Sequence, residues 1–151
     1  MSYKKILLLV LTGLLLFTGC TKDSNSESQS TWTIDGTTYT STNPASFSSG
    51  TFSAADNTQN SDIEITFQAK PTMDGSYAVS DLSDTSAINQ GSGSSTCSIN
   101  INTPTVSNYK STGSQMVSVT INSGKVTASF SDMDMKSGGH SAKASGTIIE
   151  K

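Results

Sequence analysis

Apolar and polar residues alternate one by one along much of the chain, which is the pattern of a β-strand with one buried face. The alternation is clearest at residues 63–69, 97–101 and 117–130. A further run at residues 31–40 is split by Asp35-Gly36, two residues that tolerate a positive φ, and it predicts a β-hairpin. No window of useful length carries apolar residues at helical spacing. The pattern therefore predicts an all-β fold.

Gly, Asp, Asn and Pro separate the predicted strands at short intervals, as in an antiparallel β-sandwich. A small up-and-down or calycin-like β-barrel is the alternative. About twenty positions point inward by strand period, enough for the core of one domain of this size. These inward positions include Trp32, Ile65, Phe67, Ile99, Val119 and Phe130.

Three parts of the chain are less regular. Residues 47–52 predict one short strand with an irregular entry. Residues 81–95 contain only two large apolar side chains and predict a long loop with one possible helical turn. Met133 and Met135 alternate with acidic residues, so we expect them to extend the preceding strand with their side chains in the core.

The first twenty residues have a different pattern. Two lysines precede an apolar run at residues 6–16, which is shorter than the about 20 residues of a membrane span. Phe17-Thr18-Gly19-Cys20 follows, an order typical of a secretory signal peptide. Its end resembles the bacterial lipobox, which implies cleavage before Cys20 and a lipid on its thiol. The predicted parts are a signal peptide at 1–19, the lipidated cysteine with a flexible polar tether at 20–30, and one all-β domain at 31–151.

Composition narrows the classes of partner. Without the two lysines of the predicted signal peptide, seven Lys face twelve Asp and Glu, a formal net charge of −5. This balance argues against nucleic acid as a partner, because phosphate backbones are bound by clustered Lys and Arg. It also argues against adhesion to anionic lipid through a basic face. Ser and Thr make up about a third of the chain and fit the outward positions of strands, since both are soluble and compatible with β-structure.

The chain also resembles a known group of proteins. Behind the lipobox and polar tether, the segment Trp32-Thr33-Ile34-Asp35-Gly36-Thr37-Thr38-Tyr39 resembles the opening hairpin of small all-β lipoproteins of the Bacteroidota. Residues 117–130 are similar to a hairpin near the end of those proteins. The resemblance implies an outer-membrane protein that is lipid-anchored and displayed on the cell surface. Lys22 and Asp23, just behind Cys20, resemble the surface-export signal of this group. Many such families have no assigned activity, so the resemblance implies compartment and fold only.

The sequence gives little evidence for a metal-binding site. Asp132 and Asp134 precede a Gly turn, as in a calcium loop, but Lys136 stands where a third ligand belongs. A calcium site shared with Asp81 or Asp84 is the remaining metal alternative. One His and one free Cys cannot close a zinc site. We expect no metal and no cofactor.

Three other side chains are candidates for chemistry. His140, the only histidine, lies in a Gly-rich turn without a nucleophile-elbow motif, so we expect a solvated side chain and no catalytic residue. Cys97 is the only thiol left once Cys20 is lipidated, and it alternates with two isoleucines, which predicts burial. Tyr109 lies between predicted strands, so we expect an exposed ring that could contact a ligand.

No residue set in the sequence identifies a biochemical activity. The leading hypothesis is a non-enzymatic binding or interaction module, held at the membrane through Cys20, with an unidentified protein or glycan partner. One alternative is a carbohydrate- or small-ligand-binding barrel whose pocket is closed by residues 81–95. A weaker alternative is a hydrolase with an acidic pair, such as Asp81 with Asp132. A filled core favours the first, a deep apolar cavity the second, and a pocket of convergent carboxylates the third.

Overall fold

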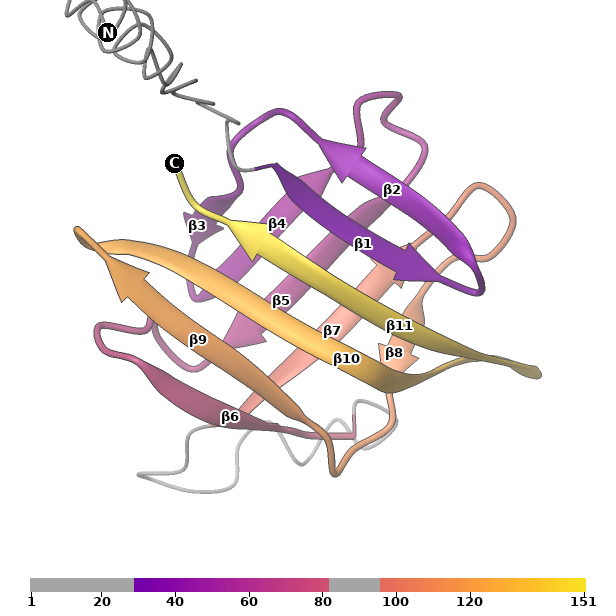
Figure 1. Ribbon diagram of the computed structural model, residues 1–151. Coiled ribbons are helices and arrows are strands. Elements are labelled where there is room, and N and C mark those ends of the chain that lie inside the picture. The colour runs from indigo at the N-terminus through magenta and orange to yellow at the C-terminus, as the bar shows by residue number, and fades with distance from the viewer. Residues whose placement is uncertain (1–28, 82–95) are drawn as a thin grey trace, which may run out of the picture.

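The computed structural model describes residues 29–81 and 96–151 (Figure 1). Cys20, Lys22, Asp23 and all but the first residue of the predicted loop at 81–95 lie outside the described residues. The described residues form eleven strands: β1 (Ser30–Ile34), β2 (Thr37–Ser41), β3 (Ser46–Ser48), β4 (Thr51–Ala55), β5 (Asp62–Phe67), β6 (Gly75–Val79), β7 (Thr96–Asn102), β8 (Tyr109–Ser111), β9 (Met116–Asn122), β10 (Lys125–Ser137) and β11 (His140–Ile149). No helix in this part of the chain is long and apolar enough to cross a membrane.

Hydrogen bonds join the strands into one sheet with the order β2-β1-β11-β10-β9-β6-β7-β5-β4-β3, while β8 pairs with both β10 and β7. The sheet curls so that β1, β11, β10 and β9 form a front layer over β4, β5 and β7 (Figure 1). The layers face each other as in a sandwich, and hydrogen bonds run from one layer to the other as in a barrel. All pairs are antiparallel except β6 with β7, which is parallel. The predicted all-β class is confirmed.

Two-residue turns account for the hairpins that the sequence predicted. Asp35 and Gly36 have φ values of 49° and 75°, and Ser123 and Gly124 have values of 51° and 76°. Two consecutive residues with positive φ match the twist of the strands on either side, which favours a tight antiparallel connection. The β1–β2 and β9–β10 hairpins follow from this geometry.

The prediction of a single strand at residues 47–52 is wrong. The segment is a hairpin in which β3 and β4 flank Ser49-Gly50, and the rings of Phe47 and Phe52 stack with centroids 4.6 Å apart. Gly50 has a φ of 86°, and a Cβ there would lie 2.6 Å from the carbonyl oxygen of Phe67. The close approach of β5 therefore requires glycine at this turn.

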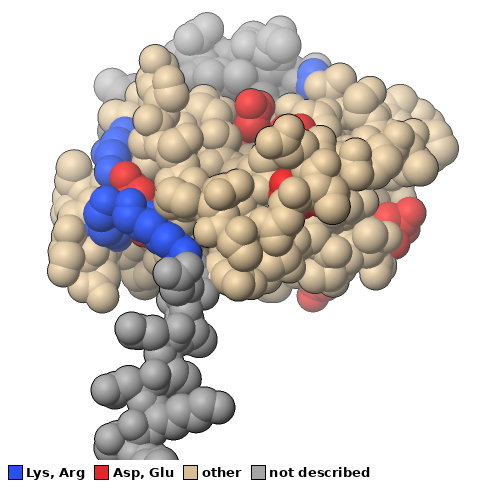
Figure 2. All heavy atoms as spheres, turned by 90° about the horizontal axis from the view of Figure 1, so that it is seen from above, with Lys and Arg blue, Asp and Glu red and all other residues tan. Residues whose placement is uncertain are grey.

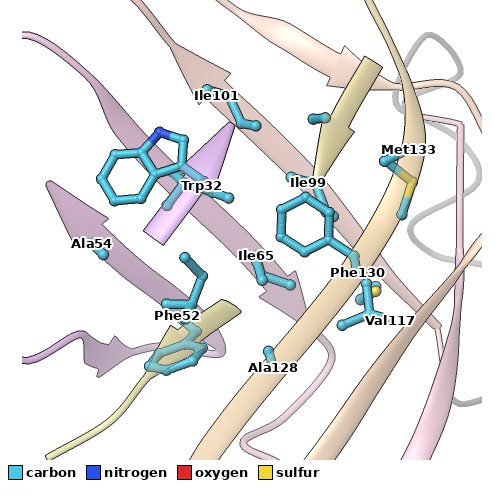
Figure 3. Close-up of a cluster of buried hydrophobic side chains, with 14 of the residues drawn as sticks. Trp32, Phe52, Ala54, Ile65, Ile99, Ile101, Val117, Ala128, Phe130 and Met133 are labelled. Carbon is cyan, nitrogen blue, oxygen red and sulfur yellow. The ribbon is translucent and has the colours of Figure 1, made fainter. Parts of the chain in front are cut away.

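The space between the two layers is filled by side chains (Figure 3). The side chains predicted to point inward are all 6% exposed or less: Trp32, Ile65, Phe67, Ile99, Val119 and Phe130. Cys97 is also buried, as predicted, and burial raises the pKa of its thiol to about 12. A thiol with such a pKa carries almost no thiolate at neutral pH, so Cys97 serves as a small apolar core residue.

An irregularity in β10 decides which side chains enter the core after Phe130. The register with β11 shifts between Phe130 and Met133, and Asp132 has a φ of 49°. The extra residue of this bulge reverses the alternation, so Met133 and Met135 are buried and the acidic side chains point out. The predicted inward methionines are confirmed.

The long hairpin β10–β11 gives the body two distinct ends. Thirteen residues of β10 span roughly 40 Å at the usual rise per residue. At one end, the backbone N–H of Ile149 donates to Ser30 Oγ at 2.9 Å, so β1 begins one residue inside the predicted tether. We call this end, with Ser30, Lys70, Lys125, Glu150 and Lys151, the terminal pole. The other end, with the Gly138-Gly139 turn, is the distal pole (Figure 1).

Candidate functional site

A cavity of about 420 Å³ opens at the distal pole. Its lining comes from three segments far apart in the sequence: the second residue after β6, the short strand β8 with its flanks, and the end of β10 with the following turn. The lining residues are Asp81, Asn108, Lys110, Thr112, Lys136, Ser137 and Gly138. The volume is within the range of small-ligand sites, and the described lining residues other than Gly138 carry polar or charged side chains.

Strand β8 positions one side of this distal pocket. It pairs with β10 through Lys110 and Lys136 and with β7 through Lys110 and Asn100. Ser111, next in the strand, is buried, and its hydroxyl accepts a hydrogen bond from the Ile99 N–H at 3.0 Å. Lys110 therefore has its backbone held between two strands, and strand period points its side chain outward.

The prediction of an exposed ring at Tyr109 is wrong. Tyr109 begins β8 and is 4% exposed, with its side chain in the core. Its two neighbours, Asn108 and Lys110, are exposed and line the distal pocket. The sequence therefore indicated the right segment and the wrong residue, because β8 has only three residues, too few for a recognisable alternation.

Two lysines dominate the charge of the pocket. Lys110 and Lys136 are direct cross-strand partners, an arrangement that destabilises a sheet when both side chains carry the same charge. Within residues 29–81 and 96–151, neither of them forms an ion pair. Asp81 contributes one carboxylate to the same lining. The described lining thus has one acid for two lysines.

The hydroxyl groups beside the lysines already donate to backbone oxygens. Ser137 Oγ donates to the carbonyl of Ser107 at 2.6 Å, and Thr112 Oγ1 donates to the carbonyl of Asp134 at 3.3 Å. Each hydroxyl keeps lone pairs that can accept from a ligand. The pocket therefore offers ammonium donors from lysine and acceptors from hydroxyl groups.

Asp132 and Asp134 lie outside the pocket lining. Asp134 forms an ion pair with Lys143 at 2.7 Å and accepts from Gln115 Nε2 at 2.6 Å. These hydrogen bonds lower the pKa of Asp134, and the one from Lys143 has a larger effect than the one from Gln115. The described residues contain no group of three or more His, Cys, Asp or Glu side chains that could hold a metal ion. The lining of the distal pocket does not bring Asp81 together with Asp132.

His140 is exposed at the start of β11, where it pairs with Ser137 across the Gly138-Gly139 turn. Its neighbour in the turn, Gly138, lines the distal pocket, but His140 does not. The structure therefore places the only histidine beside the candidate site without making it part of the lining.

Sequence reasoning missed an ordered row of hydroxyl groups on the outer surface of the front layer. Cross-strand pairing places six Ser and Thr side chains in one line across six strands, in the order Thr40, Thr31, Thr147, Ser129, Ser118, Ser76. Two shallow hollows of about 310 and 330 Å³ lie along this row. Only the strand register reveals the row, because the six residues share no local motif.

Charged side chains are sparse on the surface seen from above the body. In this view most of the surface is uncharged, and Lys side chains gather at one edge with acidic side chains among them (Figure 2).

No protein-family model, curated protein or solved structure matches the chain. The candidate site therefore depends on geometry alone.

Proposed function

We propose that the chain is a lipid-anchored lipoprotein of the outer membrane, displayed on the cell surface, and that it acts as a non-enzymatic binding module. The signal peptide at 1–19, the lipid on Cys20 and the export signal at Lys22 and Asp23 supply the location. The observation that carries the binding role is a polar pocket at the distal pole of a body whose core is filled.

The placement of the pocket supports this role. The body begins at Ser30, ten residues after Cys20, so the tether reaches at most about 36 Å. The chain therefore enters at the terminal pole, and the distal pole lies at the other end of β10. The pocket therefore lies at the end of the body opposite the proposed tether, where the tether does not obstruct it.

A ligand of small size and polar character fits the pocket best. The described lining residues supply hydrogen-bond donors and acceptors and include no large apolar side chain, so a sugar or another small polar molecule suits the pocket better than a lipid. This combines the binding-module hypothesis with the small-ligand alternative, with the pocket at the pole and not inside the barrel. The acidic-pair hydrolase has less support, because Asp81 is the only acid among the described residues of the lining.

The binding role can be tested by filling the pocket. Full-length chains would be applied to a glycan array, with Thr112→Trp as the blocked variant and Thr120→Trp as the control. Thr112 lines the pocket, whereas Thr120 is exposed on β9 away from it. We expect the wild type and Thr120→Trp to bind the same glycans and Thr112→Trp to lose them. Equal binding by all three proteins would contradict a site in this pocket.

The location can be tested on intact cells. We expect Lys22→Ala with Asp23→Ala to leave the protein lipidated and in the outer membrane but protected from added protease. Cys20→Ala should block lipidation and signal cleavage. Unchanged surface digestion of the double variant would remove Lys22 and Asp23 from the proposal.

A further inference from the structure

The register of β8 against β10 places two positively charged side chains next to each other. Lys110 and Lys136 stand directly opposite each other, at the distance where like charges destabilise a strand pair. Opposite charges at these positions would stabilise the pair instead. Nothing in the backbone geometry of β8 requires lysine, because Lys110 is exposed.

Among the described residues, no acid forms an ion pair with Lys110 or Lys136. Asp134 lies two residues before Lys136 in β10, and the charge of Lys136 helps to lower its pKa, but its carboxylate forms its ion pair with Lys143 and a hydrogen bond with Gln115. Glu64 is the next acid in the same cross-strand row, behind Asn100, so it is two strands from Lys110, about 10 Å. Asp81 is the one acid among the described residues that line the cavity with the two lysines.

We infer that the distal pocket binds an anionic oxygen group, a carboxylate or a phosphate, between the ammonium groups of Lys110 and Lys136. This inference rests on the proposed binding role of the pocket and names the class of ligand. An anion at this position turns the repulsion of the two lysines into two attractions. Asn108 and Thr112 lie in the same lining and can contact the rest of the ligand.

Because both lysines are exposed, we expect the affinity of the pocket for a single anion to be low. Ion pairs at exposed positions contribute little and are screened by salt, so one anionic group should bind weakly and less well at high ionic strength. A protein displayed in many copies on a surface can still hold a polymer with repeated acidic groups, because linked weak contacts reinforce each other.

The test measures the unfolding temperature of the full-length chain in neutral detergent at constant ionic strength. The probes are inorganic phosphate, galacturonate and neutral galactose, with sodium chloride as the reference. We expect phosphate or galacturonate to raise the midpoint by about 5 °C at a tenfold excess over Kd, and galactose to have a smaller effect. A response to phosphate alone identifies a phosphorylated ligand, and a response to galacturonate alone identifies an acidic sugar.

The variants Lys110→Gln and Lys136→Gln should each lose the anion response. Lys125→Gln removes the same charge at the terminal pole and should keep it. If galacturonate and galactose shift the midpoint equally in all four proteins, the inference is overturned while the binding role of the pocket survives. If neither anion raises the midpoint above the chloride reference, the inference is overturned as well, and the glycan array then decides the proposed function separately.

Discussion

At the terminal pole Lys70 and Lys125 surround the carboxylate of Glu150, whereas at the distal pole Lys110 and Lys136 face each other. Glu150 forms an ion pair with Lys70 at 2.5 Å and accepts from the Val126 N–H at 3.0 Å. Burial alone would raise the pKa of Glu150, but these hydrogen bonds and the charges of Lys70 and Lys125 lower it. Lysine side chains thus lie beside a carboxylate at the terminal pole, whereas at the distal pole two lysines lie beside each other.

This comparison distinguishes lysines that stabilise the fold, at the terminal pole, from lysines that we propose bind a ligand, at the distal pole. At the terminal pole, Lys125 Nζ also donates to the backbone oxygen of Lys151 at 2.7 Å, and Lys70 lies 5.2 Å from the centroid of the Phe47 ring. The charged side chains of Lys70, Lys125 and Glu150 thus each have a partner within the protein. At the distal pole the described residues supply one acid, Asp81, for two lysines, so we expect the lysines to lower the stability of the sheet until an anion binds.

The largest expected effect comes from breaking the body that holds the two poles apart. Val119 is 1% exposed in β9, and Thr120 beside it is exposed. Val119→Asp should unfold the domain, because an unpaired buried charge costs several kcal/mol, which is about the whole stability of a small domain. Thr120→Asp should be tolerated. Equal melting temperatures of the two variants would contradict the orientation of β9.

A smaller effect distinguishes the poles directly. Glu150→Gln should lower the free energy of unfolding at neutral pH by about 1 kcal/mol, since it removes a charged hydrogen-bond acceptor from between lysines. Lys110→Gln should instead leave stability unchanged or raise it, because it relieves repulsion. Denaturant unfolding of both variants measures the two signs. A loss of stability in Lys110→Gln as large as that in Glu150→Gln would mean that the distal lysines are structural.

The pH dependence sharpens the same contrast. A carboxyl whose pKa is lower in the folded state stabilises the fold above its unfolded pKa, about 4.3 for Glu, and loses that contribution as the pH falls through the folded value. The stability difference between wild type and Glu150→Gln should therefore be constant above about pH 5 and vanish in more acidic solution. A difference that persists at pH 2 would show that the glutamine variant is destabilised for another reason.

For added calcium we expect no change in stability. Calcium should leave the melting temperature of the full-length chain unchanged, because Asp134 is held by Lys143 and the described residues contain no cluster of metal ligands. A calcium ion bound only to the folded state would add about 2.7 kcal/mol at a hundredfold excess over Kd. A rise in melting temperature that a chelator reverses would contradict this reading of the acidic pair.

Local pattern was enough for most of the fold. The alternation at residues 63–69, 97–101 and 117–130 predicted β5, β7 and the β9–β10 hairpin, because one buried face imposes a period of two. It also held a clue to the bulge. Phe130 and Met133 are three residues apart, so both can face the core only if the alternation is reset between them.

The features that local pattern missed are short strands, such as β3 and β8, and pairings between distant segments. Strand β8 has only three residues, and its partners β7 and β10 define it, so Tyr109 was misplaced on the surface. The parallel pairing of β6 with β7 has no local signal either. The distal pocket needs Asp81, Lys110 and Lys136 together, and these come from three separate segments that only the folded sheet assembles.

The hydrogen bond between Ser30 and Ile149 means that the described body starts and ends at the same place. Such a body can be circularly permuted, because a short linker closes the old ends and an exposed turn supplies new ones. If the chain is opened at Gly138-Gly139, the strand registers stay the same and the tether leaves from the distal pole. In the proposed lipid-anchored arrangement, the permuted domain would have the opposite orientation, with the two lysines toward the tether, so orientation can be changed without changing the fold.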